Sequence, residues 1–267
     1  MDDHTRLTLG STFDAVADSY DARPPYPEAI YTLLTDRCGC GLGSRVLEVG
    51  PATGLATMRL LDLGATVTAV EPGPALAAEL SRRAAGRPLD VVVEPFESAE
   101  LPAAHYDLVV AATSFHWVDP RVGHAKAATH LRNGGWLALW WTVFGDPDRP
   151  DPFQKAIAPM FDELAPELNF NVSEVRPYGL DLAARAAEIE TTGLFGPVEH
   201  HIVPWEGHHT ALGIRRLFAT YSPFLALPEA KRTAALDALE RIARDDFADT
   251  VVRPYLTVLF LAPRTSA

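Results

Sequence analysis

Short apolar runs alternate with amphipathic stretches from about residue 45 to residue 144. The runs are rich in β-branched and aliphatic residues and predict buried strands, whereas apolar side chains every three or four residues predict helices. The predicted strands cover residues 46–49, 65–71, 89–93, 106–113, 136–144, 198–205 and 254–262. The predicted helices cover residues 11–22, 27–34, 55–63, 74–85, 120–131, 210–225 and 228–247. This alternation favours an α/β fold with a doubly wound seven-stranded sheet, whose last strand is antiparallel.

The pattern changes after residue 144, where a proline-rich break covers residues 146–152. Amphipathic helical segments follow to about residue 193. We therefore expect a helical cap insertion over residues 145–193, contributing to a substrate pocket, on a core formed by residues 41–144 and 194–267. Residues 1–40 are expected to form N-terminal lid helices. The alternatives are a helical decoration that touches no ligand and an N-terminal packing helix with a rigid connector.

Composition excludes several kinds of partner. The 267 residues carry a net charge of −12, which disfavours binding to nucleic acid and to anionic membranes. The first residues are acidic and no apolar run has transmembrane length, so we expect a cytoplasmic protein. The pairs His200-His201 and His208-His209 lack a spaced set of further ligands, and no metal site is predicted.

The most informative stretch is residues 45–54. A short strand ends in a loop of small residues with the pattern Glu48-x-Gly50-x-Ala52-x-Gly54, and a helix follows at once. Such a turn brings a ligand close to the backbone and to a helix N-terminus. It is not a Walker loop, because no Lys-Ser/Thr follows the glycines, and it is not G-x-G-x-x-G.

This pattern resembles the first motif of the class I S-adenosylmethionine-dependent methyltransferases, in which an acid precedes three alternating glycines. The chain departs from it at Ala52, which stands in place of the middle glycine. The methyl group of Ala52 takes room where the methionine part of the ligand would lie. The resemblance is greatest to the small-molecule group, the type 11 or trans-aconitate methyltransferase-like group, and implies a Rossmann-like fold. It implies that Glu48, Gly50, Ala52 and Gly54 contact the cofactor.

Further candidates for the cofactor site follow the next strands. Glu71 ends the second strand about twenty residues beyond the glycine loop, where a carboxylate accepts hydrogen bonds from a ribose diol. The resemblance implies that Glu97 meets the adenine amino group. Phe96 offers a ring for the adenine face, and Thr113 ends the fourth strand.

The segment from residue 20 to residue 27 reads Tyr-Asp-Ala-Arg-Pro-Pro-Tyr-Pro. It is similar to the segment that precedes the first strand in many small-molecule methyltransferases. There it closes over the cofactor, which implies that Tyr20 and Arg23 bind it.

Residues on the acceptor side come from the fourth and fifth strands. His116 lies just past a strand end, where it could take a proton from a substrate hydroxyl, amine or thiol; the alternative is a histidine that holds its loop by a hydrogen bond. Trp117 is its expected neighbour in the substrate pocket. Trp140 and Trp141 must point to opposite faces of a regular strand, so we expect one of them to line the pocket.

Together these marks predict an enzyme that transfers a methyl group from S-adenosylmethionine to a small organic acceptor through O, N or S. S-adenosylhomocysteine is the expected product, secondary metabolism the expected setting, and a monomer or homodimer the expected state. Two alternatives stay open: a non-catalytic ligand-binding protein with the same fold, which Ala52 favours, and an NAD(P)-dependent oxidoreductase, which the missing G-x-G-x-x-G disfavours.

Overall fold

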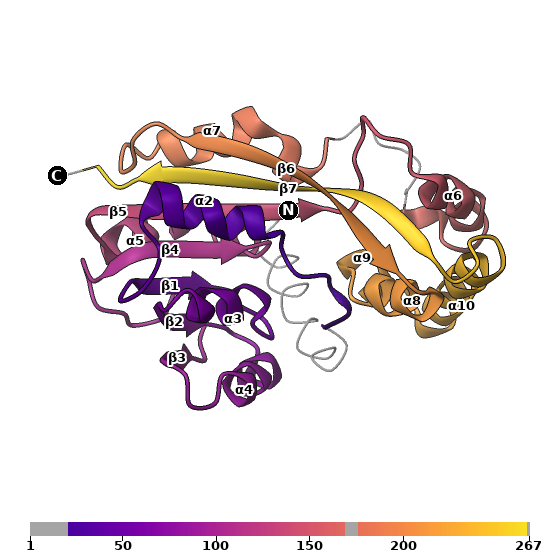
Figure 1. The fold of residues 1–267 in the computed structure, drawn as a ribbon, viewed down its shortest axis with the longest axis horizontal. Coiled ribbons are helices and arrows are strands. Elements are labelled where there is room, and N and C mark those ends of the chain that lie inside the picture. The colour runs from indigo at the N-terminus through magenta and orange to yellow at the C-terminus, as the bar shows by residue number, and fades with distance from the viewer. Residues whose placement is uncertain (1–20, 169–175, 266–267) are drawn as a thin grey trace.

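A computed structural model describes residues 21–168 and 176–265, so Tyr20 and the predicted helix over residues 11–22 lie outside the described residues. A seven-stranded sheet with the order β3-β2-β1-β4-β5-β7-β6 crosses the molecule (Figure 1). Its strands are β1 (Arg45–Val49), β2 (Thr66–Val70), β3 (Leu89–Val92), β4 (Tyr106–Ala112), β5 (Leu131–Val143), β6 (Glu199–His209) and β7 (Val251–Pro263).

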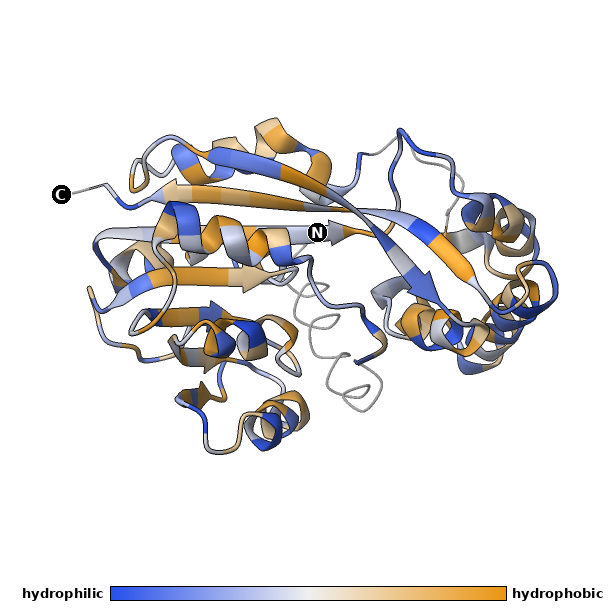
Figure 2. Ribbon diagram, in the orientation of Figure 1, coloured by the Kyte–Doolittle hydropathy of each residue, from blue (hydrophilic) through white to orange (hydrophobic). Residues whose placement is uncertain are grey.

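Strands β1 to β5 are parallel, and β7 runs antiparallel to both β5 and β6. This confirms the predicted fold class. The central strands β1 and β4 are mostly hydrophobic, whereas the edge strand β6 is largely hydrophilic (Figure 2). Strands buried on both faces need continuous apolar runs, and an edge strand does not.

Helices cover both faces of the sheet. One face carries α2 (Glu28–Cys38), α3 (Leu55–Asp62) and α4 (Pro74–Arg83), whose apolar side chains share a core with Val46 and Trp140. The other face carries α5 (Gly123–His130) and α7 (Leu182–Glu190), which share a core with Trp141. Neighbouring tryptophans therefore point to opposite faces, as the strand period requires.

A third core lies at one end of the molecule (Figure 1). It joins α6 (Pro152–Leu164), α8 (Ala211–Ala219), α9 (Ser222–Leu225) and α10 (Glu229–Asp245). These helices pack where β6 and β7 continue as a two-stranded ribbon beyond the last pair between β5 and β7, Val143 with Leu256.

This grouping differs from the cap expected over residues 145–193. Among the described residues of that range, α6 and the short helix η3 (Pro166–Leu168) belong to the helical end. Ile189 of α7 and Leu180 of the short helix η4 (Tyr178–Leu180) pack in the core of the sheet instead. No helix of the described residues is long and apolar enough to cross a membrane.

Candidate functional site

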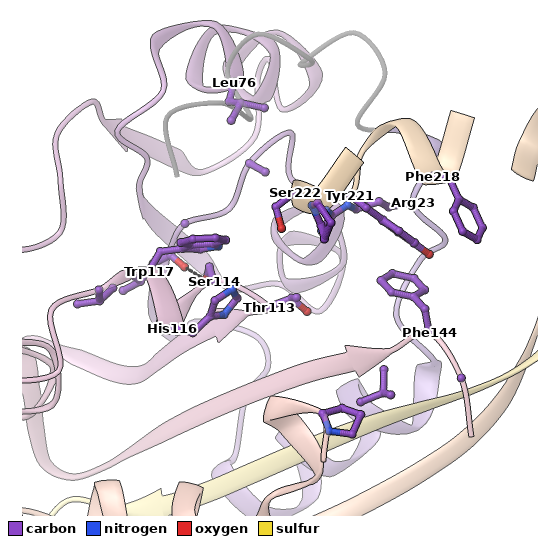
Figure 3. A pocket seen from close by; sticks show the side chains of 18 of the residues that line it. Arg23, Leu76, Thr113, Ser114, His116, Trp117, Phe144, Phe218, Tyr221 and Ser222 are labelled. Carbon is purple, nitrogen blue, oxygen red and sulfur yellow. Dashed lines mark hydrogen bonds between the residues drawn. The ribbon is translucent and has the colours of Figure 1, made fainter. Parts of the chain in front are cut away.

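A cavity of about 1160 Å³ lies between the carboxyl ends of the parallel strands and the helical end of the molecule (Figure 3). Open α/β sheets bind ligands at this edge, where loops follow the strands. We call its first side the strand-end wall, formed by Gly50, Ala52, Glu71, Phe96, Glu97 and Thr113. We call its second side the helical wall, formed by Phe144, Asp151, Phe218, Tyr221 and Arg253.

The glycine loop allows close approach to its backbone. Gly50 has φ +67°, and a Cβ there would lie 2.6 Å from Cβ of Ser114. Gly54 has φ +96° and precedes α3; a Cβ there would lie 2.5 Å from Leu80 Cδ1. Both positions therefore require glycine. Gly50 lies on the cavity, whereas Gly54 shapes the turn and packs against α4 without lining the cavity.

Glu71 is held by the main chain of two loops. Its Oε2 accepts from the amide of Ala52 at 2.9 Å, and its Oε1 accepts from the amide of Gly73 at 3.0 Å. The side chain is 5% exposed and lines the cavity. Carboxylate oxygens accept hydrogen bonds, which is what the hydroxyl groups of a ribose diol require of a partner.

Ala52 adopts the left-handed conformation, with φ +50°. Alanine tolerates this conformation at a cost of about 1 kcal/mol, which glycine avoids. The loop thus keeps the backbone geometry that a glycine would adopt at this position, and its amide remains in place for Glu71.

Glu48 lies beneath the loop and does not line the cavity. It is fully buried, and its Oε2 accepts from Thr57 Oγ1 at 2.6 Å. Its Oε1 has no hydrogen-bond partner among the described residues. Burial raises the pKa of Glu48 to about 7. The structure therefore does not place Glu48 in direct contact with a ligand in the cavity, contrary to the sequence-based expectation, because its side chain packs under α3.

Phe96 and Glu97 do share the strand-end wall. The ring of Phe96 is buried against Phe115, with ring centroids 6.5 Å apart, and the ammonium group of Lys126 lies 5.6 Å from the ring centroid. Oε1 of Glu97 accepts from the amide of Asp119 at 2.7 Å. Both side chains are thereby fixed by the loop and by α5.

An N-terminal strap, residues 21–27, crosses from the sheet to the helical end. Tyr26 donates to the carbonyl oxygen of Ala112 at 3.1 Å and lies 3.3 Å from Oγ1 of Thr113. Arg23 donates to the carbonyl oxygen of Thr220, at the end of α8, at 2.8 Å. Thr113 and Arg23 both line the cavity, so the strap joins its two walls.

His116 and Trp117 lie on a short helix, η2 (Phe115–Trp117), directly after β4, and both line the cavity. Trp141 donates from Nε1 to His116 Nδ1 at 3.0 Å. Burial, together with the charges of Arg23 and Arg185, lowers the pKa of His116 to about 4. A ring with this pKa is a weak base at neutral pH.

Trp140 and Trp141, the other residues expected at the substrate pocket, do not line this cavity. Trp140 is fully buried on the α2 face, edge-on to Tyr26. Trp141 is 5% exposed and lies behind His116, between Tyr178 and Phe260. Helices cover both faces of the sheet at this strand, so neither indole reaches the cavity.

Sequence reasoning missed the helical wall. Tyr221 lies between Phe144 and Phe218, with 5.0 Å between its ring centroid and each of theirs. Its hydroxyl is buried without a hydrogen-bond partner among the described residues. The common apolar face of Phe218 and Tyr221 was visible in the sequence, but periodicity does not say what such a face contacts.

A buried ion pair supports this wall. Arg253, on the ribbon part of β7, donates to Asp151 Oδ2 at 2.8 Å and to Gln154 Oε1 at 2.9 Å. It also donates to the carbonyl oxygen of Phe144 at 3.2 Å. The side chains of Arg253 and Asp151 are 2% and 9% exposed. The pair fixes the start of α6 against the ribbon. Among the described residues, no group of three or more His, Cys, Asp or Glu side chains could hold a metal ion.

Comparison with known proteins identifies the class. A family model described as a methyltransferase domain matches residues 47–139. The chain is 34% identical over 152 residues to an uncharacterized methyltransferase, YrrT, of Bacillus subtilis, covering 55% of this chain and 68% of that protein. The chain therefore belongs to the class I S-adenosylmethionine-dependent methyltransferases.

Other relatives extend the match. An uncharacterized methyltransferase of Mycobacterium tuberculosis, Rv3342, is 27% identical over 260 residues, covering 95% of this chain and 96% of that protein. Phosphoethanolamine N-methyltransferase 2 of Haemonchus contortus, solved with S-adenosyl-L-methionine, has a TM-score of 0.56 at 15% identity, covering 95% of this chain and 57% of that one. YcgJ of Bacillus subtilis has a TM-score of 0.54 at 14% identity, covering 90% and 100%. The two solved structures share the fold.

The residues present fit S-adenosylmethionine. Gly50 brings its main chain to the cavity, Glu71 presents a carboxylate there, and Phe96 and Glu97 offer a ring and a carboxylate on the same wall. The chain is thus an S-adenosylmethionine-dependent methyltransferase, and S-adenosylmethionine is its cofactor.

Proposed function

We propose that this enzyme methylates a small organic molecule held against the helical wall. The observation that supports this most directly is the cavity of about 1160 Å³, which joins the strand-end wall to Phe144, Phe218 and Tyr221. Sites for drug-sized ligands measure about 300–1000 Å³. The volume thus exceeds that of an ordinary single-ligand site and suits a cofactor together with a small acceptor.

The proposed roles of the residues divide between the walls. Glu71 would bind the ribose hydroxyls, and Phe96 and Glu97 would hold the adenine. When bound, S-adenosylmethionine supplies an electrophilic methyl group on a sulfonium ion. The helical wall would orient the acceptor towards that group and exclude water, and positioning of this kind lowers much of the barrier to a two-substrate reaction.

Charge argues for a small acceptor over a nucleic acid. The chain carries a net charge of −12, and binding to phosphates needs clustered lysine and arginine side chains. The aromatic character of the helical wall favours an acceptor with an apolar part. Location in the cytoplasm, the monomeric or dimeric state and a setting in secondary metabolism remain predictions.

The test is turnover with a chemically sorted panel. Purified protein is incubated with S-adenosylmethionine and small phenols, carboxylic acids, amines and thiols, and in parallel with RNA, DNA and protein. S-adenosylhomocysteine and methylated product are measured by mass spectrometry. We expect product with a member of the small-molecule panel, and turnover with macromolecules alone would overturn the proposal.

A matched pair of variants ties turnover to the helical wall. Phe144→Ala removes a ring that lines the cavity, whereas Phe247→Ala removes a ring that packs on Phe153 outside it. We expect Phe144→Ala to raise the KM for the acceptor roughly tenfold, because a lost apolar contact in a pocket has about this effect. Affinity for S-adenosylhomocysteine should stay within threefold in both variants.

A further inference from the structure

His116 occupies the junction between the two walls of the cavity (Figure 3). Its ring lies 4.6 Å from that of Trp117 and 5.7 Å from that of Tyr178, measured between centroids. The sequence offered two roles for this residue, a general base or a hydrogen bond that holds its loop. The hydrogen bonding around the ring supports neither role as first stated.

The first observation concerns Nδ1. The indole Nε1–H of Trp141 is a donor only, and it points at Nδ1 of His116 at 3.0 Å. Nδ1 must therefore keep its lone pair, which places the proton of the neutral ring on Nε2. Trp141 cannot readily turn away, because it is packed between Tyr178 and Phe260.

The second observation concerns Nε2. No hydrogen bond from this nitrogen to any of the described residues is present, although His116 lines the cavity. Nε2 is also absent from the fully buried polar atoms that lack a partner. The ring consequently presents an N–H group to the space where a ligand would bind.

Burial favours the neutral form of the ring, and the charges around it act in the same direction. Arg23 of the strap and Arg185 of α7 both act on His116, and both disfavour a positive charge there. Tyr178, from η4, donates to Glu188, which also pairs with Arg185. Protonation of Nδ1 would add a further cation and break the hydrogen bond from Trp141. An oxygen that carries negative charge is, in contrast, favoured beside these groups.

We propose that His116 binds the methyl acceptor as a hydrogen-bond donor, through Nε2–H to an oxygen lone pair, and that Trp141 fixes the tautomer that makes this possible. His116 removes no proton and forms no bond in this role. The acceptor must then carry an oxygen with a lone pair at this point, as a carbonyl, a carboxylate or an ionised hydroxyl does. The identity of the partner as the methyl acceptor rests on the proposed function; the tautomer does not.

The tautomer can be measured directly. In protein labelled with ¹⁵N at histidine, long-range ¹H–¹⁵N spectra distinguish a protonated from an unprotonated ring nitrogen. We expect His116 to be neutral and protonated at Nε2 from pH 6 to pH 8. A ring protonated at Nδ1, or one that becomes charged within this range, would overturn the proposal.

Two tryptophan variants separate the hydrogen bond from general packing. Trp141→Phe removes the donor to Nδ1, so we expect His116 to populate both tautomers and to titrate at a higher pH. Trp205→Phe is the control, because Trp205 donates its indole N–H to Thr257 on β7 instead. An unchanged tautomer in Trp141→Phe would show that Trp141 does not fix the ring.

Two small ions test whether the donor is available. Acetate can accept a hydrogen bond, whereas ethylammonium, of similar size, cannot. In protein saturated with S-adenosylhomocysteine, we expect acetate to shift the Nε2–H resonance and ethylammonium to leave it in place. A resonance that acetate does not move would contradict an accessible donor. These measurements need no turnover, so they still test the proposal if no small molecule of the panel is methylated.

Kinetics with an acceptor from the panel complete the test. We expect His116→Ala to raise the KM for the acceptor roughly tenfold and to keep kcat within threefold, because a lost hydrogen bond weakens binding. His116→Gln keeps an N–H donor and should recover most of the affinity. A loss of kcat of about 10² or more that follows an ionisation near pH 6–7 would instead identify His116 as a base.

Discussion

The strand-end wall and the helical wall face the same cavity but are built differently. The strand-end wall consists mainly of main-chain geometry: the left-handed conformations of Gly50 and Ala52, and amide groups that fix Glu71. The helical wall consists of side chains, with Tyr221 between two phenylalanines and Arg253 behind them.

This difference has a consequence for substitutions. A wall made of backbone geometry tolerates few residue types at its special positions. A wall made of packed side chains changes shape with each substitution. We therefore expect changes in the strand-end wall to alter cofactor affinity, and changes in the helical wall to alter acceptor binding and stability.

The largest expected effect lies behind the helical wall. Arg253→Met leaves Asp151 buried without its partner, and breaking a buried pair in this way costs about 3–5 kcal/mol. Thermal unfolding should show a melting temperature lower by roughly 10 °C. Arg149→Met is the control, because Arg149 pairs with Glu206 at the surface, with both side chains 46% exposed; it should cost less than about 1 kcal/mol. Equal decreases in melting temperature in the two variants would contradict the role of burial.

The next effect concerns the strand-end wall. Glu71→Ala removes the carboxylate that anchors Ala52 and Gly73, and with it the proposed ribose acceptor. Affinity for S-adenosylhomocysteine, measured by calorimetric titration, should fall roughly 10²-fold or more, since charged hydrogen bonds contribute about 1.5–3 kcal/mol each.

Glu94→Ala serves as its control, because Glu94 is exposed and does not line the cavity. It should bind S-adenosylhomocysteine as the native protein does. Parallel titrations with NADH and NADPH should give no binding in any of these proteins. Native affinity in Glu71→Ala would remove Glu71 from the cofactor site.

A smaller effect depends on pH and comes from beneath the strand-end wall. The folded state raises the pKa of Glu48 from 4.5 to about 7 through burial. Between these values the folded protein keeps a proton that the unfolded chain releases. The buried, protonated side chain of Glu48 therefore contributes fully to stability below pH 4.5, and this contribution is lost as the pH rises through 7.

Glu48→Gln should remove this dependence. In urea unfolding, we measure the free energy of unfolding of Glu48→Gln minus that of the native protein. This difference should increase by roughly 1 kcal/mol from pH 6 to pH 8. A constant difference across this range would mean that Glu48 is ionised in the folded protein throughout.

The smallest effect tests the departure from the glycine pattern. Ala52→Gly relieves a left-handed alanine and should stabilise the protein by about 0.5–1 kcal/mol. Ala248, with φ +49°, lies outside the cavity and gives a matched control. Both variants should gain similar stability, and only Ala52→Gly should change the affinity for S-adenosylhomocysteine, by less than about threefold. A much larger increase in the affinity of Ala52→Gly for S-adenosylhomocysteine would show that the methyl group of Ala52 obstructs the cofactor.

The two walls also differ in how well the sequence predicted them. Glu71, Phe96 and Thr113 each follow a strand, and the ends of parallel strands meet at one edge, so strand assignment predicted that they lie close together. Glu97 was predicted from the resemblance, and it lies on the same wall. Glu48 was also predicted to lie at the cofactor, but it lies within β1, on the face of the sheet that α3 covers. Sequence spacing alone did not separate these two situations.

The helical wall depends on contacts between distant segments. Arg23 meets Thr220, and Arg253 meets Asp151. Amphipathic periodicity predicted that α6, α8 and α10 each have an apolar face, but it did not say that these faces meet each other while α7 joins the sheet. The two tryptophans of β5 were assigned to opposite faces correctly, yet the helices that cover both faces could not be placed from the sequence.

The position of β7 has a consequence for biosynthesis. This strand is translated after every other strand of the sheet, yet it lies between β5 and β6. While the chain is still being synthesised, β1 to β5 can pair among themselves, because all their mutual contacts come from residues 45–143. Among the described residues, β6 pairs with β7 alone, and Asp151 pairs with Arg253 of β7. On the ribosome the cofactor side can therefore form first, and the acceptor side is completed only when β7 emerges.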